Sequence, residues 1–203
     1  ARTAIQILLD DVDQWLATES SEERPPFPLG GLNLVLSIMA DRGELDHSIK
    51  LMNMVSEYNL PADADSFCSA FEVLGKHITF RTKYLNRSAK EDVCIFALDR
   101  AMIYLDMMDS RGIELNTSTI RHYVELLCLC NEIETATEVV RDGSRRGAVN
   151  DRTIYRVAKA NAHIGNFHVA REVGSLSRQP NRFLFIKIEA LERLRSREKP
   201  MDS

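Results

Sequence analysis

The sequence predicts an all-α fold of stacked helical hairpins, and three observations predict it. The 203 residues are 44% apolar, which is enough for a packed core and too much for a disordered chain. Only 9 Gly and 6 Pro interrupt the chain, too few for a many-stranded β-sandwich. Similar segments recur at a spacing near 34 residues, which is typical of stacked helix–turn–helix units. We therefore expect one repeat domain of about four units with flanking helices.

The first predicted element is a helix over residues 1–17. Its apolar residues recur at spacings of three and four and share one face: Ala4, Ile5, Leu8, Leu9, Val12 and Leu16. Residues 18–28 are rich in Ser, Glu and Pro, and three prolines within four residues end any helix. We interpret this segment as a linker, and the helix before it as half of a preceding repeat.

Turn signals and small residues then divide the chain into hairpins. The turns inside the first, third and fourth units align at Gly43, Asn131 and Gly165. Five residues further on, the same alignment brings together three small residues, where two helices must approach closely: Ser48, Ala136 and Ala170. Each of the first three units closes on a residue that accepts hydrogen bonds from the free amides of the next helix: Asp63, Asn116 and Asn150.

These signals predict repeats over residues 29–63, 64–116, 117–150 and 151–185, followed by a C-terminal capping helix and tail over 186–203. The second repeat has 53 residues where about 35 are expected from the repeat length. Its extra residues fall near 76–93, where the first fifteen residues carry five basic and no acidic side chains: Lys76, Arg81, Lys83, Arg87 and Lys90. We expect a projecting basic loop that holds phosphates, with a solvated insertion as the alternative.

Charge changes sign along the chain. The net charge is −4, but residues 1–75 hold 4 Lys and Arg against 13 Asp and Glu, a net charge of −9. Residues 76–203 hold 22 against 17, a net charge of +5. This polarity favours an acidic part that contacts protein and a basic part that contacts RNA.

Other classes of function find no support. The four cysteines form no CxxC pair and have no histidine at zinc-ligand spacing, so we expect reduced thiols, no metal and no cofactor: Cys68, Cys94, Cys128 and Cys130. The histidines, serines and cysteines form no catalytic motif, so we expect no enzyme and no small-molecule ligand. The longest apolar stretches are far shorter than the ~20 residues of a membrane span, which predicts a soluble chain. The chain starts with Ala1 rather than with an initiator Met, and no signal peptide is recognisable there. We therefore expect a trimmed chain whose targeting segment is missing.

The units resemble pentatricopeptide repeats, the helix–turn–helix repeats of organellar RNA-binding proteins. The resemblance covers roughly residues 29–180 and is clearest in the first unit, LGGLNLVLSIMADRGELDHSIKLMNMVSEYNLPAD, with Asn33 at its fifth place and Asp63 at its end. It implies a right-handed solenoid whose concave face binds RNA.

In that family the fifth and last residues of each repeat read one base, and Asn with Asp resembles a uracil reader. The resemblance thus pairs Asn33 with Asp63, Cys68 with Asn116, and Arg121 with Asn150, while the fourth unit offers either Tyr155 or Arg156. Ser118 and Arg152 are expected on the same face.

Two functions remain open at this point. The first is contact with single-stranded or ribosomal RNA as part of a ribonucleoprotein of a mitochondrion or plastid. The alternative is a protein scaffold subunit of an organellar complex, such as a ribosome, without direct readout of RNA. Other proteins of the complex are expected partners in both cases.

Overall fold

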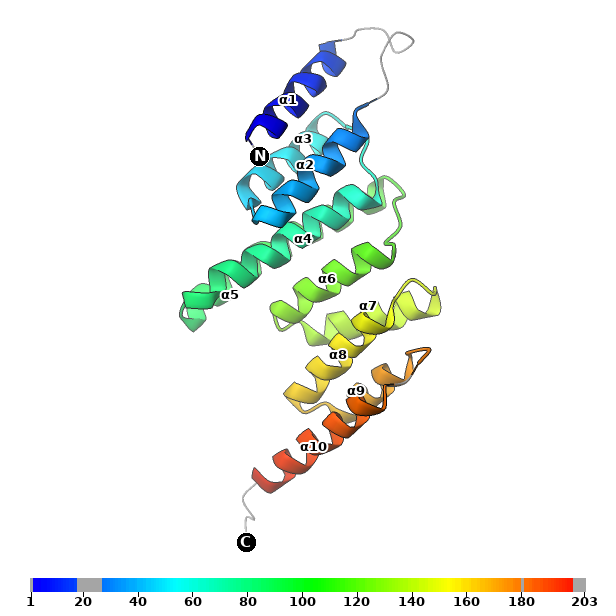
Figure 1. Cartoon of the computed structure of the whole chain (residues 1–203). Helices are drawn as coiled ribbons and strands as arrows, with labels where there is room; N and C mark the ends of the chain where they lie inside the picture. Colours follow the sequence, from blue (N-terminus) through cyan, green and yellow to red (C-terminus); the bar gives the residue numbers. More distant parts are fainter. Residues whose placement is uncertain (1, 18–26, 180, 199–203) are drawn as a thin grey trace. The chain divides into compact units, whose positions relative to one another are not determined.

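The computed structural model describes residues 2–17, 27–179 and 181–198, and within these ranges the regular structure is entirely helical (Figure 1). The predicted all-α class is therefore confirmed. Residue 1, most of the predicted linker (18–26), residue 180 and the tail 199–203 lie outside the described residues. Within the described ranges, no helix combines the length and the apolar character needed to cross a bilayer.

The chain forms two compact units, Ala1–Glu114 and Leu115–Ser203. The N-terminal unit contains α1 (Arg2–Ala17), α2 (Leu29–Arg42), α3 (Leu45–Glu57), α4 (Ala64–Arg81), the 3-10 turn η1 (Thr82–Tyr84) and α5 (Arg87–Ser110). The C-terminal unit contains α6 (Thr117–Leu129), α7 (Ile133–Arg145), α8 (Asp151–Ile164), α9 (Phe167–Ser175) and α10 (Arg182–Glu198). The predicted repeats correspond to the hairpins α2–α3, α4–α5, α6–α7 and α8–α9. The last helix begins at Arg182, four residues before the predicted start of the capping helix, and packs against α8 and α9.

Six helix ends share one backbone device, a single residue in the left-handed region. These residues are Gly43, Asn59, Gly112, Asn131, Gly147 and Gly165, with φ between +48° and +95°. The next residue donates its amide to the carbonyl five residues back, as from Glu44 to Met39 at 3.0 Å, and the same bond closes the other five turns. The turn positions that align in the sequence therefore share one physical cause.

The helix starts confirm the predicted caps. The side chains of Asp63, Asn116 and Asn150 each accept a hydrogen bond from the backbone amide three residues on, at 2.9–3.0 Å. Each of those amides belongs to a buried hydroxyl residue, namely Ser66, Thr119 and Thr153. The spacing Asp/Asn-x-x-Ser/Thr thus marks the first helix of the second, third and fourth hairpins.

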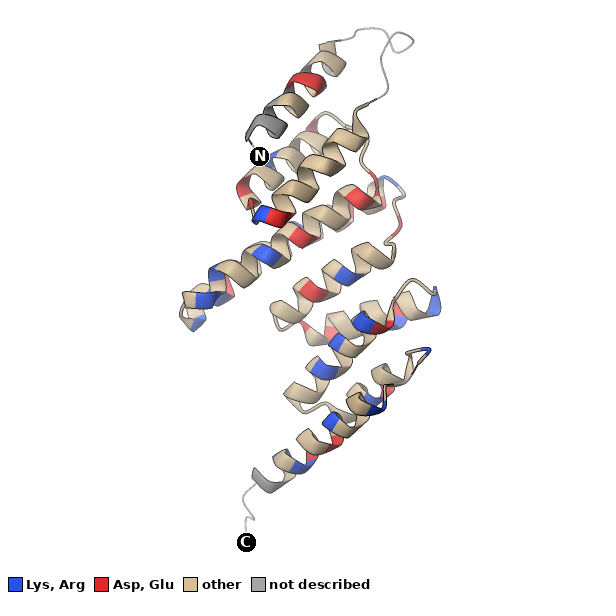
Figure 2. Cartoon of the chain, in the orientation of Figure 1, with Lys and Arg blue, Asp and Glu red and all other residues tan. Residues whose placement is uncertain are grey.

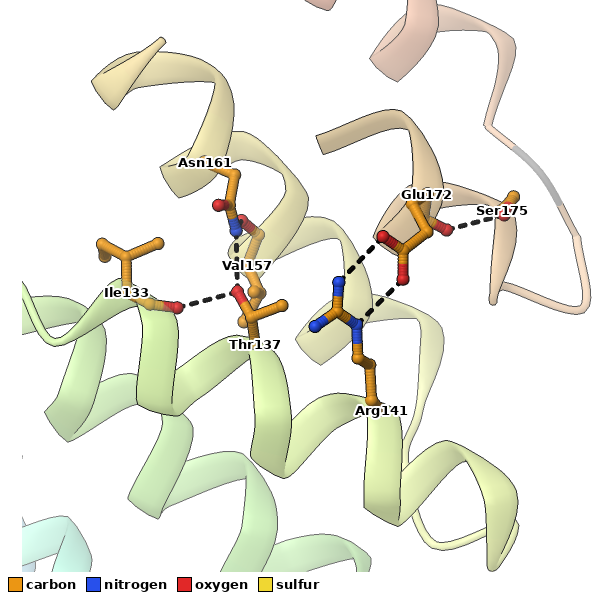
Figure 3. A network of polar contacts seen from close by, with 7 residues as sticks. All are labelled: Ile133, Thr137, Arg141, Val157, Asn161, Glu172 and Ser175. Carbon is orange, nitrogen blue, oxygen red and sulfur yellow. Dashed lines mark hydrogen bonds and ion pairs between the residues drawn. The ribbon is translucent and has the colours of Figure 1, made fainter. Parts of the chain in front are cut away.

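The small residues expected from the alignment are buried in three of the hairpins. Ser48, Ala136 and Ala170 are all at most 1% exposed. In the C-terminal unit, Asn161 of α8 donates to the Thr137 hydroxyl of α7 at 2.9 Å, and Thr137 donates to the Ile133 carbonyl at 2.7 Å (Figure 3). Asn161 also donates to the Val157 carbonyl of its own helix at 3.1 Å, so the bond to Thr137 is the contact between α7 and α8 that a slip of register would break.

An ion pair adds a second connection to α7. Arg141 donates through Nε and Nη2 to the two oxygens of Glu172 in α9, each at 2.8 Å (Figure 3). These bonds from Arg141 hold the pKa of Glu172 below its ordinary value. The two-pronged geometry ties α7 to α9 more specifically than a single contact would.

The expected basic loop over 76–93 is wrong, because the inserted residues lengthen two helices. The first helix of this hairpin has 18 residues and the second has 24, whereas α6 and α7 have 13 each. Lys76 and Arg81 lie in α4, Lys83 lies in η1, and Arg87 and Lys90 lie in α5. Residues 76–93 contain neither Gly nor Pro, so nothing ends α4 before η1, and the side chain of Asn86 then caps α5 by accepting from Ala89 at 2.9 Å.

A matched pair of glycine substitutions tests the left-handed turns. We expect Gly112→Ala to destabilise the protein by about 1 kcal/mol, because a Cβ there meets no neighbour within 4 Å and only its φ of +64° opposes it. Gly30→Ala, also with no neighbour within 4 Å but inside α2, should stabilise by about 0.5 kcal/mol. Urea unfolding curves measure both changes, and equal signs would contradict the conformational explanation.

Candidate nucleic-acid interface

Asn33 and Asp63, the pair expected to read a base, are brought together by the packing of α2 against α4. Asn33 Nδ2 donates to Asp63 Oδ1 at 3.1 Å and to Oδ2 at 3.3 Å. The Ser66 hydroxyl donates to Asn33 Oδ1 at 2.5 Å. Three polar side chains from two helices thus form one half-buried cluster, and its amide plane is held in place at both ends.

The carboxylate of this cluster is stabilised in its charged form. Burial acts against it, but hydrogen bonds from the Ser66 amide, the Asn33 side chain, the Ser66 hydroxyl and the Asp65 amide lower the pKa of Asp63 below its ordinary value of 3.8. The same carboxylate therefore caps α4 and orients Asn33.

The other members of the expected set in the N-terminal unit differ in character. Cys68 occupies the fifth place of α4, and its side chain is half-buried. Lys76 pairs with Glu72 at 2.9 Å and with Asp41 at 3.2 Å, so its charge is already neutralised. Arg87 pairs with Glu91 at 3.0 Å, while Arg81 and Lys90 are exposed.

In the C-terminal unit, three of the basic and aromatic candidates are already bonded within the protein: Arg121, Tyr155 and Arg156. Arg156 donates to Glu125 of α6 at 2.5 Å, and Arg121 Nη2 lies 2.6 Å from His122 Nε2. The Tyr155 hydroxyl lies 2.9 Å from Ser177 Oγ and donates to the carbonyl of Gln179. Helix α8 begins at Asp151, directly after the cap Asn150, so Tyr155 is its fifth residue and Arg156 its sixth. No hydrogen bond joins Arg121 to Asn150 among the described contacts.

Two of the expected residues of this unit remain open to solvent. Ser118 and Arg152 are exposed in the first turns of α6 and α8. Asn116 and Asn150 are exposed too, but their side-chain oxygens already accept from the first turn of the helix that each caps.

A groove of about 450 Å³ lies between α8 and α10 in the same unit. Tyr155, Phe183 and Leu191 supply much of its apolar surface, and Lys159 and Lys187 also line it. A flat or apolar group could lie there beside two ammonium groups.

Sequence reasoning missed the partners that hold the candidates in place. Ser66, Glu125 and Ser177 each bond a candidate from another position in the fold. Only Ser66 carries a local signal, since it follows its cap by three residues. Among the described residues, no cluster of His, Cys, Asp and Glu could hold a metal ion, and the four cysteines form no disulfide. Burial raises the pKa of Cys128 to about 11, so its thiol stays protonated at neutral pH.

The lowered pKa of Asp63 predicts a pH-dependent contribution to stability. Asp63→Ala should destabilise the protein by about 1 kcal/mol at pH 7, because it removes the cap and the orientation of Asn33. A depressed folded-state pKa means that this contribution is present above the unfolded pKa and is lost as the pH falls through the folded value. The difference from wild type should therefore shrink from pH 7 to about pH 3 in urea unfolding. Asp65→Ala, in the same turn but exposed, is the control, and an Asp63→Ala effect that does not change with pH would contradict the explanation.

Comparison with known proteins gives a match in fold. No protein-family model matches the chain, and no curated protein matches it. Among solved structures, it is similar to the Arabidopsis thaliana nuclear protein-only RNase P 2, with a TM-score of 0.61 and 17% identity over 80% of this chain and 35% of that one. It is also similar to the pentatricopeptide repeat protein PPR10 in complex with an 18-nt psaJ RNA element, with a TM-score of 0.59 and 16% identity over 95% of this chain and 27% of that one. The chain thus spans about a third or less of the proteins it matches. Its fold is therefore a helical-repeat fold similar to that of pentatricopeptide repeat proteins.

Proposed function

We propose that this chain is a helical-repeat RNA-binding protein of organellar gene expression, which contacts single-stranded or ribosomal RNA as part of a ribonucleoprotein assembly. The observation that carries the proposal is the Asn33–Asp63 pair, whose two side chains are hydrogen-bonded at the fifth and last places of one repeat. The fold likeness to PPR10, which was solved with RNA, supports the same role.

The chemistry of the pair suits a uracil edge. Asn33 Nδ2 has two N–H groups, so one can donate outward when the other is bonded to Asp63. Asp63 Oδ2 has only the longer contact to Asn33 and keeps acceptor capacity. One outward donor beside one acceptor complements the carbonyl and N3–H of uracil.

The other predicted base-reading residues favour RNA contact as part of an assembly over RNA binding by the chain alone. Stacking or edge contacts supply ~1–3 kcal/mol for each base, and one ordered pair alone gives weak binding. Arg121, Tyr155 and Arg156 are each held by a contact within the protein, so a further base would have to displace these contacts or use the remaining donors. RNA contact would therefore be strengthened by neighbouring proteins and by contacts that do not depend on sequence.

Fluorescence anisotropy with oligouridine and oligoadenosine tests the proposal. We expect a preference for uridine that Asn33→Ala lowers by about tenfold, because one base-edge contact is lost. Asn53→Ala, an exposed asparagine of α3, is the matched control and should bind like wild type. Absence of RNA binding at low salt, for the chain alone and for its native complex, would overturn the proposed function. Binding without any effect of Asn33→Ala would remove the reading role but keep RNA contact.

A protein scaffold is the second candidate, and α5 favours it. Within the N-terminal unit this helix packs against α4 and η1. It nevertheless exposes four large apolar side chains, Ile95, Phe96, Met102 and Ile103, by 40–62%. Contiguous apolar surface of this kind is typical of a contact with another protein.

This candidate predicts a different response from the first. Replacing Ile95 and Met102 by Ser should release the chain from its native complex in a sedimentation assay while oligouridine binding stays unchanged. Leu34→Ser, at an exposed apolar position of α2, is the control. Retention of the Ile95/Met102 double variant in the complex would contradict the scaffold role of α5.

A further inference from the structure

We propose that three arginines at one edge of the C-terminal unit, Arg145, Arg152 and Arg178, bind the phosphate backbone of RNA without reading bases. This inference rests on the proposed RNA-binding function and names a second surface for it. We call this surface the arginine edge.

The fold brings together the segments that carry these side chains. Arg145 ends α7, Arg152 lies in the first turn of α8, and Arg178 lies in the turn after α9. A Cβ placed on Gly147, in the turn between α7 and α8, would lie 3.8 Å from Arg178 Nη2. Asp151 accepts from the Ser177 hydroxyl at 2.7 Å and from the Arg178 amide at 3.3 Å, which holds the later turn against the start of α8. Figure 2 shows the basic colour at both turns, on the right of this unit in the view.

The acidic groups near this edge are already engaged. Asp142 pairs with Arg146 at 2.9 Å, and Glu172 pairs with Arg141. Asp151 accepts the two bonds from the α9–α10 turn. The arginine edge keeps three exposed guanidinium groups for which the described residues supply no ion-pair partner.

Helix capping does not explain all of these charges. Arg145 lies at the end of α7, where the helix dipole favours a cation. Arg152 lies in the first turn of α8, where the dipole disfavours one. A cation at that place is therefore not explained by the helix dipole, and its guanidinium group has no ion-pair partner among the described residues.

The arginine edge differs from the predicted base-reading residues in whether the arginines are bonded within the protein. Of the base-reading residues, Arg121 and Arg156 already contact His122 and Glu125. Arg145, Arg152 and Arg178, by contrast, are exposed, and no ion pair within the described residues engages them. Each presents a fork of donors that matches phosphate oxygens, and none of the contacts described would distinguish one base from another.

Salt-dependent binding tests the proposal with the full chain. The probes are oligouridine and oligoadenosine of about 20 nucleotides, titrated by anisotropy between about 50 and 200 mM KCl. Each phosphate contact on a single strand contributes about 0.7 to the slope of log K against log salt. Combining Arg145→Ala, Arg152→Ala and Arg178→Ala should therefore lower the slope by about 2 and the affinity by about 100-fold at 0.1 M salt, equally for both probes.

A charge-matched variant provides the control. Arg42→Ala, Lys50→Ala and Arg193→Ala together remove three exposed positive charges outside this edge and should change binding much less. Circular dichroism establishes that both triple variants are folded, and Arg152→Lys should restore most of the binding lost in Arg152→Ala.

Three results would overturn the proposal in different ways. Equal losses in the two triple variants would show that only net charge matters. If the triple edge variant binds RNA like wild type while Asn33→Ala loses the uridine preference, the edge proposal is overturned and the proposed function stands. Wild-type binding to polyglutamate together with no RNA binding would assign the edge to an acidic protein and overturn both proposals.

Discussion

Left-handed residues at the helix ends are the constraint on which the rest of the structure depends. Each turns the chain away from the helix axis, and the amide that follows satisfies a carbonyl that would otherwise lack a partner. Within each unit, these turns keep consecutive helices in contact, as α2 with α3 and α6 with α7. The cap that follows, as at Asp63 or Asn150, then starts the next helix at a defined residue. Register along each helix, and with it the place of every candidate residue, follows from these two ends.

The caps also connect the fold with the proposed function. Asp63 is at once the cap of α4 and the partner of Asn33, so one carboxylate sets both the helix start and the orientation of the amide. Asn116 and Asn150 perform the first task, but the fifth-place partner of Asn116 is a cysteine, Cys68, and Arg121, the fifth-place partner of Asn150, contacts His122. A repeat can therefore keep its backbone while its reading pair is lost. We interpret the chain as a stack of repeats in which the first repeat holds an ordered Asn33–Asp63 pair. In the C-terminal unit, three exposed arginines lie at the arginine edge.

The basic residues fall into two groups, those that form ion pairs within the protein and those that are open to solvent. The basic residues of the insertion lie on lengthened helices and are partly neutralised, as Lys76 is by Asp41 and Glu72. In the C-terminal unit the ion pair of Arg141 with Glu172 supports packing, whereas Arg152 and Arg178 remain open. The net charge of +5 over residues 76–203 therefore includes cations that form ion pairs within the protein and cations that are open to solvent.

The sequence by itself determined the helical class, the hairpin boundaries and the caps, because these depend on local backbone preferences and on spacing along one helix. Gly43, Asn116 and Asp63 carry such signals within a few residues. Only the tertiary structure decided that residues 76–93 lengthen two helices and that Ile95 and Met102 face solvent. Arg156 meeting Glu125, and Arg178 lying over Gly147, likewise join residues from different helices. Contacts across helices depend on packing angles and side-chain conformations that no local pattern encodes, so the availability of each charge could be assigned only in three dimensions.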